Sequence, residues 1–166
     1  MAPPPASPGR AATMSKEQVD RTKAAEQFKA APYSDGRTGQ SIGYGFHVNA
    51  WPEKAKDIRV PITKAQADEL FDYVDSWNAN YMAKKLGIDV WNSLDQRQID
   101  ALLSVAYNTG APGLWGAIES DLRTKNFEKV AQKIETHATS GNQGVVKVDL
   151  SPRRRRDAEL FRAGSM

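Results

Sequence analysis

The chain has 166 residues, enough for one domain or for two small lobes that share a helix, and its 40% hydrophobic and 26% charged residues are ordinary for a globular protein. The absence of cysteine excludes disulfides and thiolate metal sites, and with only two histidines present we expect neither a metal nor a cofactor. A formal net charge of +3 is a mild excess that favours polyanionic partners without selecting one.

The first thirteen residues are rich in proline and alanine and have neither an aromatic residue nor a periodic apolar face. Such a segment gains too little from packing to offset the entropy that ordering costs. We therefore predict a flexible tail or linker over residues 1–13 and a folded domain over 14–166. No secretory signal and no apolar run of ~18 residues is visible, so we expect a soluble protein made in the cytoplasm, which needs a partner if its target lies outside that compartment.

The N-terminal part of this domain is predicted to form a helix followed by a small antiparallel sheet. Ser15 and Gln18 fit a capping box that opens a helix over about 15–30. From Tyr33 to Val48, glycines and an Asp-Gly turn punctuate short extended runs. The stretch 49–61 contains two prolines, and there we expect an excursion with one further edge strand at most. The small sheet lobe thus covers about 31–61.

The remainder, about 62–163, is predicted to be a helical lobe. Thr63 and Gln66 form a second capping box, and apolar residues then recur at helical spacing as far as Leu86, which predicts a long helix that joins the lobes. Ser93 and Gln96 repeat the cap signature before a central buried helix that ends at Gly110. Shorter helices are expected over 114–123 and 126–136, and Ser151-Pro152 is predicted to open a last helix to about 162. The fold class is α+β, mostly helical.

Three polar residues near the first helix have the spacing of a catalytic site. Glu26 lies near the end of that helix, Asp35 follows nine residues later in the turn, and Ser41 comes six residues after that. Cleavage of a glycosidic bond needs one protonated carboxyl group to release the leaving oxygen and one ionised carboxylate to activate water. Spacing alone is also compatible with ordinary solvated surface carboxylates.

The residues around these three carry a resemblance. The segment from Glu26 to Gly45, E-x8-D-x5-S-I-G-Y-G, resembles the active-site signature of the phage-type lysozymes (glycoside hydrolase family 24), which usually has Thr at the serine position. Leu94 to Gly110 resembles the central helix of this family, and Arg155 to Glu159 resembles its C-terminal Arg-Arg-x-x-Glu motif. The resemblance therefore spans nearly the whole of Met14 to Phe161. It implies a lysozyme-like fold, with a small sheet lobe joined by a long helix to a helical lobe.

The resemblance also implies roles for the three residues. Glu26 would be the general acid, and Asp35 would place and deprotonate the attacking water. The family is associated with inversion, which requires the two carboxyl groups to lie ~6.5–9.5 Å apart. Ser41 keeps the hydroxyl of the usual threonine and can help to hold the water, but without the branched methyl its χ1 angle is less restricted.

Further residues are expected around the substrate or the acid. As substrate-binding residues we expect Gly45, His47, Tyr107, Asn108 and Ser120. Local roles remain open for several of them: a turn glycine, a histidine with a local hydrogen bond, and an aromatic residue that packs the end of the central helix. In the family an arginine of the last helix pairs with the catalytic glutamate, so we expect Arg154 or Arg155 to reach Glu26 while the rest of that run stays solvated.

The resulting hypothesis is a monomeric muramidase that hydrolyses the β-1,4 bond between N-acetylmuramic acid and N-acetylglucosamine and lyses bacteria. Its partner is the glycan strand of peptidoglycan in the periplasm, which it would reach with the help of a holin; a virion-associated lysozyme is also compatible. Two alternatives share the fold: a catalytically weak peptidoglycan-binding domain and a lytic transglycosylase. A basic nucleic-acid-binding protein is a third, and it predicts DNA binding that weakens steeply with salt. We expect no nucleic-acid partner.

Overall fold

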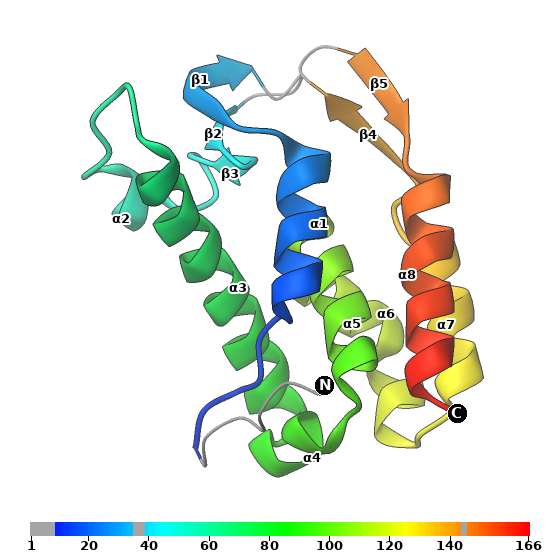
Figure 1. The fold of residues 1–166 in the computed structure, drawn as a ribbon. Coiled ribbons are helices and arrows are strands. Elements are labelled where there is room, and N and C mark those ends of the chain that lie inside the picture. Colours follow the sequence, from blue (N-terminus) through cyan, green and yellow to red (C-terminus); the bar gives the residue numbers. More distant parts are fainter. Residues whose placement is uncertain (1–8, 35–38, 144–145) are drawn as a thin grey trace.

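The computed structural model describes residues 9–34, 39–143 and 146–166. The elements are helix α1 (Lys16–Glu26), strands β1 (Lys29–Ser34), β2 (Gln40–Gly43) and β3 (Phe46–His47), helices α2 (Pro52–Ala55), α3 (Lys64–Leu86), α4 (Ile88–Ser93), α5 (Gln96–Thr109), α6 (Ala111–Arg123) and α7 (Phe127–Thr136), strands β4 (Ser140–Gln143) and β5 (Val146–Asp149), and helix α8 (Ser151–Gly164). Figure 1 shows strands β1 to β3 at one end of the molecule, with α3 running from there to the helices at the other end. The predicted α+β, mostly helical fold is confirmed.

The three-stranded sheet is antiparallel in the order β1-β2-β3. In the central strand, Ser41 lies opposite Tyr33 of β1 and His47 of β3. The next residue, Ile42, lies opposite Phe46, and both side chains are buried in the core. Because successive side chains of a strand point to opposite faces, the sheet packs on the core through the Ile42–Phe46 face and presents Ser41 and His47 on the other.

The excursion after the sheet contains the short helix α2 and no strand over 49–61, so the further edge strand that the sequence allowed is absent there. Pro52 suits the first turn of a helix because its fixed φ angle is helical and its missing N–H is not needed there. Trp51, just before it, packs edge-on against two rings of α3, with centroids 5.6 Å from Tyr73 and 5.0 Å from Trp77. These contacts attach the excursion to the long helix.

Helix α3 is the predicted bridge between the lobes. Its capping box is present in both directions, with the Thr63 hydroxyl accepting from the Gln66 N–H and the Gln66 side chain accepting from the Thr63 N–H. The helix contacts β2 and β3 at one end and α4, α5 and α6 further along. It is the longest described helix, and no helix within the described ranges combines the length and apolarity of a membrane span.

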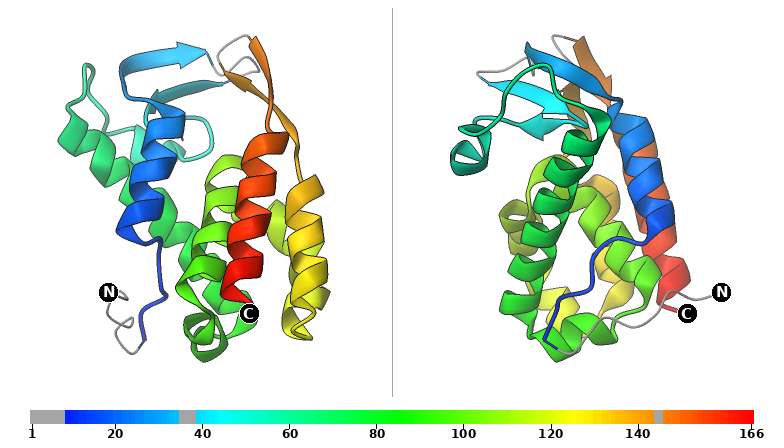
Figure 2. Two further views of the ribbon diagram at one scale, coloured as in Figure 1. Left: turned by 45° about the vertical axis from the view of Figure 1, so that its right-hand side comes forward. Right: turned by 60° about the vertical axis from the view of Figure 1, so that its left-hand side comes forward.

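Helix α5 is the centre of the helical lobe. Every residue from Gln98 to Tyr107 is buried, and α5 contacts α1, α3, α6 and α8. A helix that is covered on all sides in this way must supply apolar residues around most of its circumference. The left view of Figure 2 shows α8 and α7 beside α5 on the side away from α3, whereas α6 packs against both α5 and α3.

The cap of α5 differs from the predicted one. Ser93 belongs to the end of α4, where its hydroxyl donates to the Val90 carbonyl at 2.7 Å. Asp95 is the actual N-cap, and it forms a reciprocal capping box with Gln98. The sequence thus contains two cap patterns two residues apart, Ser-x-x-Gln from Ser93 and Asp-x-x-Gln from Asp95. The prediction chose the first, and the second caps the helix.

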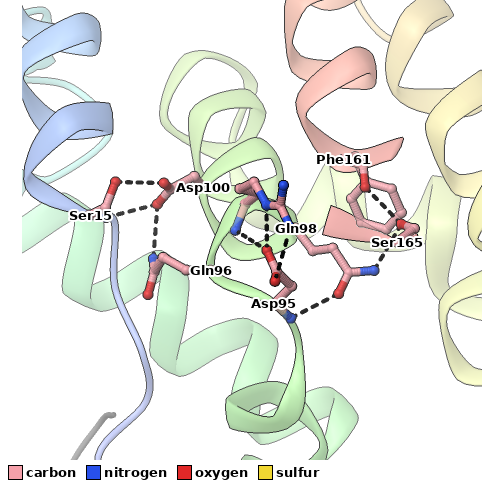
Figure 3. Close-up of polar contacts among 8 residues, drawn as sticks. Ser15, Asp95, Gln96, Gln98, Asp100, Phe161 and Ser165 are labelled. Carbon is pink, nitrogen blue, oxygen red and sulfur yellow. Dashed lines mark hydrogen bonds and ion pairs between the residues drawn. The ribbon is translucent and has the colours of Figure 1, made fainter. Parts of the chain in front are cut away.

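Polar side chains at the start of α5 also hold neighbouring helices (Figure 3). Asp100 accepts hydrogen bonds from the Ser15 backbone at 2.8 Å and from its hydroxyl at 2.6 Å, at the beginning of α1. Gln98 donates to the Ser165 hydroxyl at 3.0 Å, just after α8. These contacts fix the start of α1 and the end of α8 to the same turn of α5.

The hairpin of β4 and β5 was not predicted. Its register pairs Ser140 with Asp149 and Gln143 with Val146, and it leads directly into α8. Both strands are only four residues long. β4 has no apolar side chain, and β5 alternates apolar and polar residues over too short a run to predict a strand. The N-cap of α8 is Leu150 rather than the predicted Ser151, whose N–H donates to the Asp149 carboxylate at 2.9 Å.

The N-terminal arm, residues 10–13, is packed against α4 and α5, so the prediction of a flexible segment is wrong there; residues 1–8 lie outside the described part of the chain. Ala11 is 3% exposed and belongs to the core. Asn92 accepts from the Ala12 N–H at 2.8 Å and donates to the Arg10 carbonyl at 2.9 Å. The Trp91 indole donates to the Ala12 carbonyl at 2.9 Å. Side chains about eighty residues away thus form hydrogen bonds with the backbone of the arm, and the composition of the arm does not reveal these partners.

Removal of residues 1–12 is therefore expected to destabilise the protein by about 2 kcal/mol relative to removal of 1–9, because it leaves Trp91 and Asn92 without these partners. Urea unfolding of the two truncated proteins, followed by circular dichroism, measures the difference. Equal unfolding midpoints would mean that the arm contributes nothing.

The buried carboxylate of Asp75 makes stability depend on pH. Asp75, on α3, is 5% exposed and accepts from the Met14 N–H at 3.2 Å. Burial raises its pKa to about 7, the Met14 hydrogen bond opposes this, and the charges of Asp72 and Asp100 add to it. The folded state therefore binds this proton more tightly than the unfolded state, so the stabilisation is complete below about pH 4 and is lost as the pH rises to 7.

We expect Asp75→Asn to remove this dependence. Between pH 5 and pH 7.5 the free energy of unfolding of the unmodified protein should fall relative to that of the variant by about 2 kcal/mol. Denaturant titrations across this range measure the difference, and Glu69→Gln, at an exposed position of the same helix, is the matched control. Parallel pH profiles for the Asp75 variant and the unmodified protein would contradict the assignment.

Candidate active site

Glu26 is the last residue of α1, the position at which the chain turns from the helix toward the sheet. The helix begins as predicted, with the Ser15 hydroxyl accepting from the Gln18 N–H. It ends four residues earlier than predicted because Gln27 has a φ angle of 62°, outside the helical region. The Glu26 carboxylate is consequently placed at a helix end, with its side chain 18% exposed.

Arg153, in the first turn of α8, is the cation beside Glu26. One of its guanidinium nitrogens donates to Glu26 Oε1 at 3.2 Å, and its side chain is 24% exposed. We expected Arg154 or Arg155 in this role, and the structure corrects that expectation. Arg155 and Arg156 are exposed, as expected for the solvated part of the arginine run. The arginine that contacts Glu26 is Arg153.

Arg154 is fully buried and connects three helices. Its Nε donates to the His137 carbonyl at 2.8 Å, at the end of α7, and a terminal nitrogen donates to the Asn108 side chain, near the end of α5. Asp157 lies on the next turn of α8, with 3.7 Å between the charged groups. Burial raises the pKa of Asp157 to about 6, against a hydrogen bond from Ser104 and the nearby arginines. Arg154 thus holds Asn108 and the base of α8 in place.

Gly45 lies against the other side of the Glu26 carboxylate. A Cβ atom at this position would lie 2.7 Å from Glu26 Oε2, closer than real contacts allow. Its φ angle of 76° is also in the left-handed region that favours glycine. Both observations make Gly45 a neighbour of the Glu26 carboxylate, beyond a plain turn glycine.

Tyr107 packs the end of α5 beside the sheet. It is 7% exposed, stacks on Phe71 with a centroid distance of 4.6 Å, and donates its hydroxyl to the Tyr44 carbonyl at 2.6 Å. Burial, and next the charge of Glu26, raise the pKa of its phenol, so the hydroxyl remains a donor. These contacts favour the packing role that the sequence left open and fix the backbone next to Gly45.

Ser41 and His47 form a side-chain pair across β2 and β3. The Ser41 Oγ and His47 Nδ1 atoms share a hydrogen bond of 2.9 Å. Ser41 is 2% exposed, whereas His47 is exposed. The local hydrogen bond that the sequence left open for this histidine is therefore present.

Two other expected site residues remain to be placed, and only Ser120 belongs to the described part of the chain. Asp35 lies outside the described residues, directly after Ser34, the last residue of β1. Ser120 is exposed near the end of α6, where its carbonyl accepts from Thr124. The structure thus assembles Glu26, Arg153 and Gly45 at one point, with Ser41 and His47 paired in the adjoining sheet.

Arg153 is the site residue that sequence reasoning missed. The buried residues of α8, Arg154, Asp157, Ala158 and Phe161, follow the spacing i, i+3, i+4, i+7. This spacing marks the stripe of a helix that faces the core. Extended back from Phe161 and Ala158, it predicts that Arg154 is buried, which leaves Arg153 and Arg155 as the candidates to reach Glu26.

The arrangement, a glutamate at a helix end beside a small sheet, with a long helix leading to a helical lobe, defines the lysozyme class of fold. A family model for phage lysozyme matches residues 23–159. The structure resembles a P22 lysozyme variant at 26% identity, with a TM-score of 0.67 and coverage of 90% of this chain and 98% of that one. A search of curated proteins gives no match.

Two further solved structures share the fold at lower identity. One is the muramidase domain of SpmX from Asticaccaulis excentricus, at 21% identity and a TM-score of 0.66, covering 89% of this chain and 96% of that one. The other is an endolysin from Escherichia coli O157:H7 phage FAHEc1, at 20% identity and a TM-score of 0.65, covering 90% of this chain and 93% of that one. The chain belongs to the phage lysozyme family. It is accordingly a glycosidase of the lysozyme type, an enzyme that degrades peptidoglycan.

Proposed function

We propose that the protein is an inverting muramidase that hydrolyses the β-1,4 bond between N-acetylmuramic acid and N-acetylglucosamine, with Glu26 as general acid. The observation that carries this proposal is the position of the Glu26 carboxyl group, fixed at the end of α1 between the Arg153 guanidinium and Gly45. The family match includes both Glu26 and Arg153.

Glu26 acts on the leaving-group side. Its carboxyl group donates a proton to the glycosidic oxygen as the bond from this oxygen to the anomeric carbon breaks. The carboxylate that remains is negatively charged, and Arg153, at 3.2 Å, is in place to stabilise it. Gly45 leaves room for the carboxyl group to keep this position.

Asp35 and Ser41 act on the opposite face of the sugar. We propose that Asp35 takes a proton from a water molecule whose oxygen attacks the anomeric carbon, and that the Ser41 hydroxyl holds this water. The new bond forms on the face opposite to the one that breaks, which inverts the configuration. Ser41 lies in β2, hydrogen-bonded to His47 and opposite Tyr33, two residues before Asp35 in the chain.

The names of the relatives support this substrate. The similar structures are called lysozyme, muramidase domain and endolysin, and we extend that activity to this chain. Action in the periplasm, release with the help of a holin, and a monomeric state remain predictions.

Mass spectrometry of muropeptides after digestion of purified peptidoglycan tests the function. Hydrolysis gives products with reducing N-acetylmuramic acid ends, a lytic transglycosylase gives anhydro ends, and a pure binding domain gives no cleavage. Proton NMR of the first products then identifies the anomer. Anhydro ends, or initial products that retain the β configuration, would overturn the proposed mechanism.

A further inference from the structure

Ser41 of β2 and His47 of β3 form a hydrogen-bonded side-chain pair. The two residues are directly opposite in the antiparallel β2–β3 ladder, so their side chains are neighbours on one face of the sheet. Their 2.9 Å hydrogen bond joins a buried hydroxyl to an exposed imidazole.

The serine side chain at position 41 has a freedom of rotation about χ1 that a threonine side chain there would lack. The second substituent on the Cβ of threonine restricts its χ1 angle, whereas serine populates three staggered rotamers more freely. A hydroxyl that rotates among three positions holds a water molecule in the required place for only part of the time. An additional contact is needed to select one rotamer, and the hydrogen bond to His47 Nδ1 is such a contact.

We propose that His47 is a positioning residue, which fixes the Ser41 hydroxyl in one rotamer and so replaces the constraint that the missing threonine methyl would supply. This inference rests on the proposed role of Ser41 in holding the attacking water. It assigns His47 a role through Ser41, in place of the substrate contact expected from the sequence.

Either proton arrangement of the pair leaves Ser41 able to hold water. If Nδ1 carries no proton, the Ser41 hydroxyl donates to it and its oxygen can still accept a hydrogen bond. If Nδ1 carries a proton, it donates to Ser41 Oγ, and the hydroxyl proton is available to another acceptor. In both arrangements the rotamer of Ser41 is fixed by the same contact.

The test is a double-mutant cycle on release of reducing ends from soluble glycan strands. His47→Leu removes the hydrogen-bonding group at a similar size, whereas His47→Asn keeps one at the δ position. Each substitution is made with Ser41 and with Ser41→Thr. Asn49→Ala is the matched control, because Asn49 also bonds across this sheet, accepting from the Gln40 N–H at 3.0 Å, without contacting Ser41.

We expect His47→Leu to lower kcat about fivefold with KM little changed, since it frees one hydroxyl among three rotamers and removes one hydrogen bond. In the Ser41→Thr background the same change should cost less than about twofold, because the branched side chain is already restricted. His47→Asn and Asn49→Ala should retain nearly normal kcat. Proton couplings of Ser41 measured by NMR should report one χ1 rotamer, and averaged rotamers in His47→Leu.

Equal losses of kcat from His47→Leu in the serine and threonine backgrounds would overturn the proposal, as would a change confined to KM. A Ser41 side chain that keeps one rotamer in His47→Leu would also overturn it. If the unmodified protein releases no reducing ends, the muramidase function itself fails, and that failure is distinguishable because it precedes any comparison of variants.

Discussion

Replacement of Glu26 by glutamine is expected to lower the rate of cell-wall lysis by on the order of 100-fold or more while the protein remains folded. Glutamine has nearly the same shape, and its amide oxygen can still accept from Arg153, but it has no proton to give to the leaving oxygen. Loss of turbidity of a cell-wall suspension measures the rate, and thermal unfolding by circular dichroism measures the folded fraction.

Glu17→Gln is the matched control for this experiment. Glu17 is an exposed carboxylate in the first turn of the same helix. Its substitution makes the same change in charge at the other end of α1, so we expect it to leave lysis almost unchanged. Near-normal lysis by the Glu26 variant would remove Glu26 from its role.

The elements that the sequence predicted well are those whose signals are local. The Thr63–Gln66 capping box and the apolar spacing that follows predicted α3, and the structure has both. The same kind of signal predicted α7 and α8 to within a few residues. Where two cap patterns stood two residues apart, before α5, the sequence offered no means of choosing, because both satisfy the same local rule.

Features that depend on distant partners could not be predicted in this way. The N-terminal arm has no apolar pattern of its own, and it is ordered by Trp91, Asn92 and Gln96, about eighty residues away in the chain. The composition of a segment indicates only how much apolar surface the segment itself can bury. The arm is held instead by hydrogen bonds from its backbone to side chains of the helical lobe.

The site shows the same division. The motif predicted Glu26 and Ser41 as site residues, and Glu26, predicted near the end of the first helix, is the last residue of α1. Which arginine reaches Glu26 depends on the rotation of α8 about its axis, since adjacent residues on a helix differ by about 100°. Arg154 faces the core and Arg153 faces Glu26, a distinction that the run of four arginines conceals.

Gly45 is the position at which a single added methyl group should disturb the acid most directly. The atom that a Cβ would meet at 2.7 Å is Oε2 of Glu26, the end of a side chain that can move away at little cost in folding energy. A movement that hardly changes the folding energy can still lower the rate strongly, because a displacement of about 1 Å of a catalytic group can reduce the rate on the order of 100-fold. The Arg153 contact on the other carboxylate oxygen would be displaced with it.

We therefore expect Gly45→Ala to lower the lytic rate per folded molecule by on the order of 100-fold, with a loss of stability of about 1–2 kcal/mol from its φ angle of 76°. Gly87→Ala separates the two effects. Gly87 also has a positive φ angle, 102°, but a Cβ there would meet only Val90, at an ordinary 3.9 Å. It should lose comparable stability and keep its activity. If the two variants lose activity equally once corrected for the folded fraction, the backbone strain alone explains the effect, and Gly45 has no role in placing Glu26.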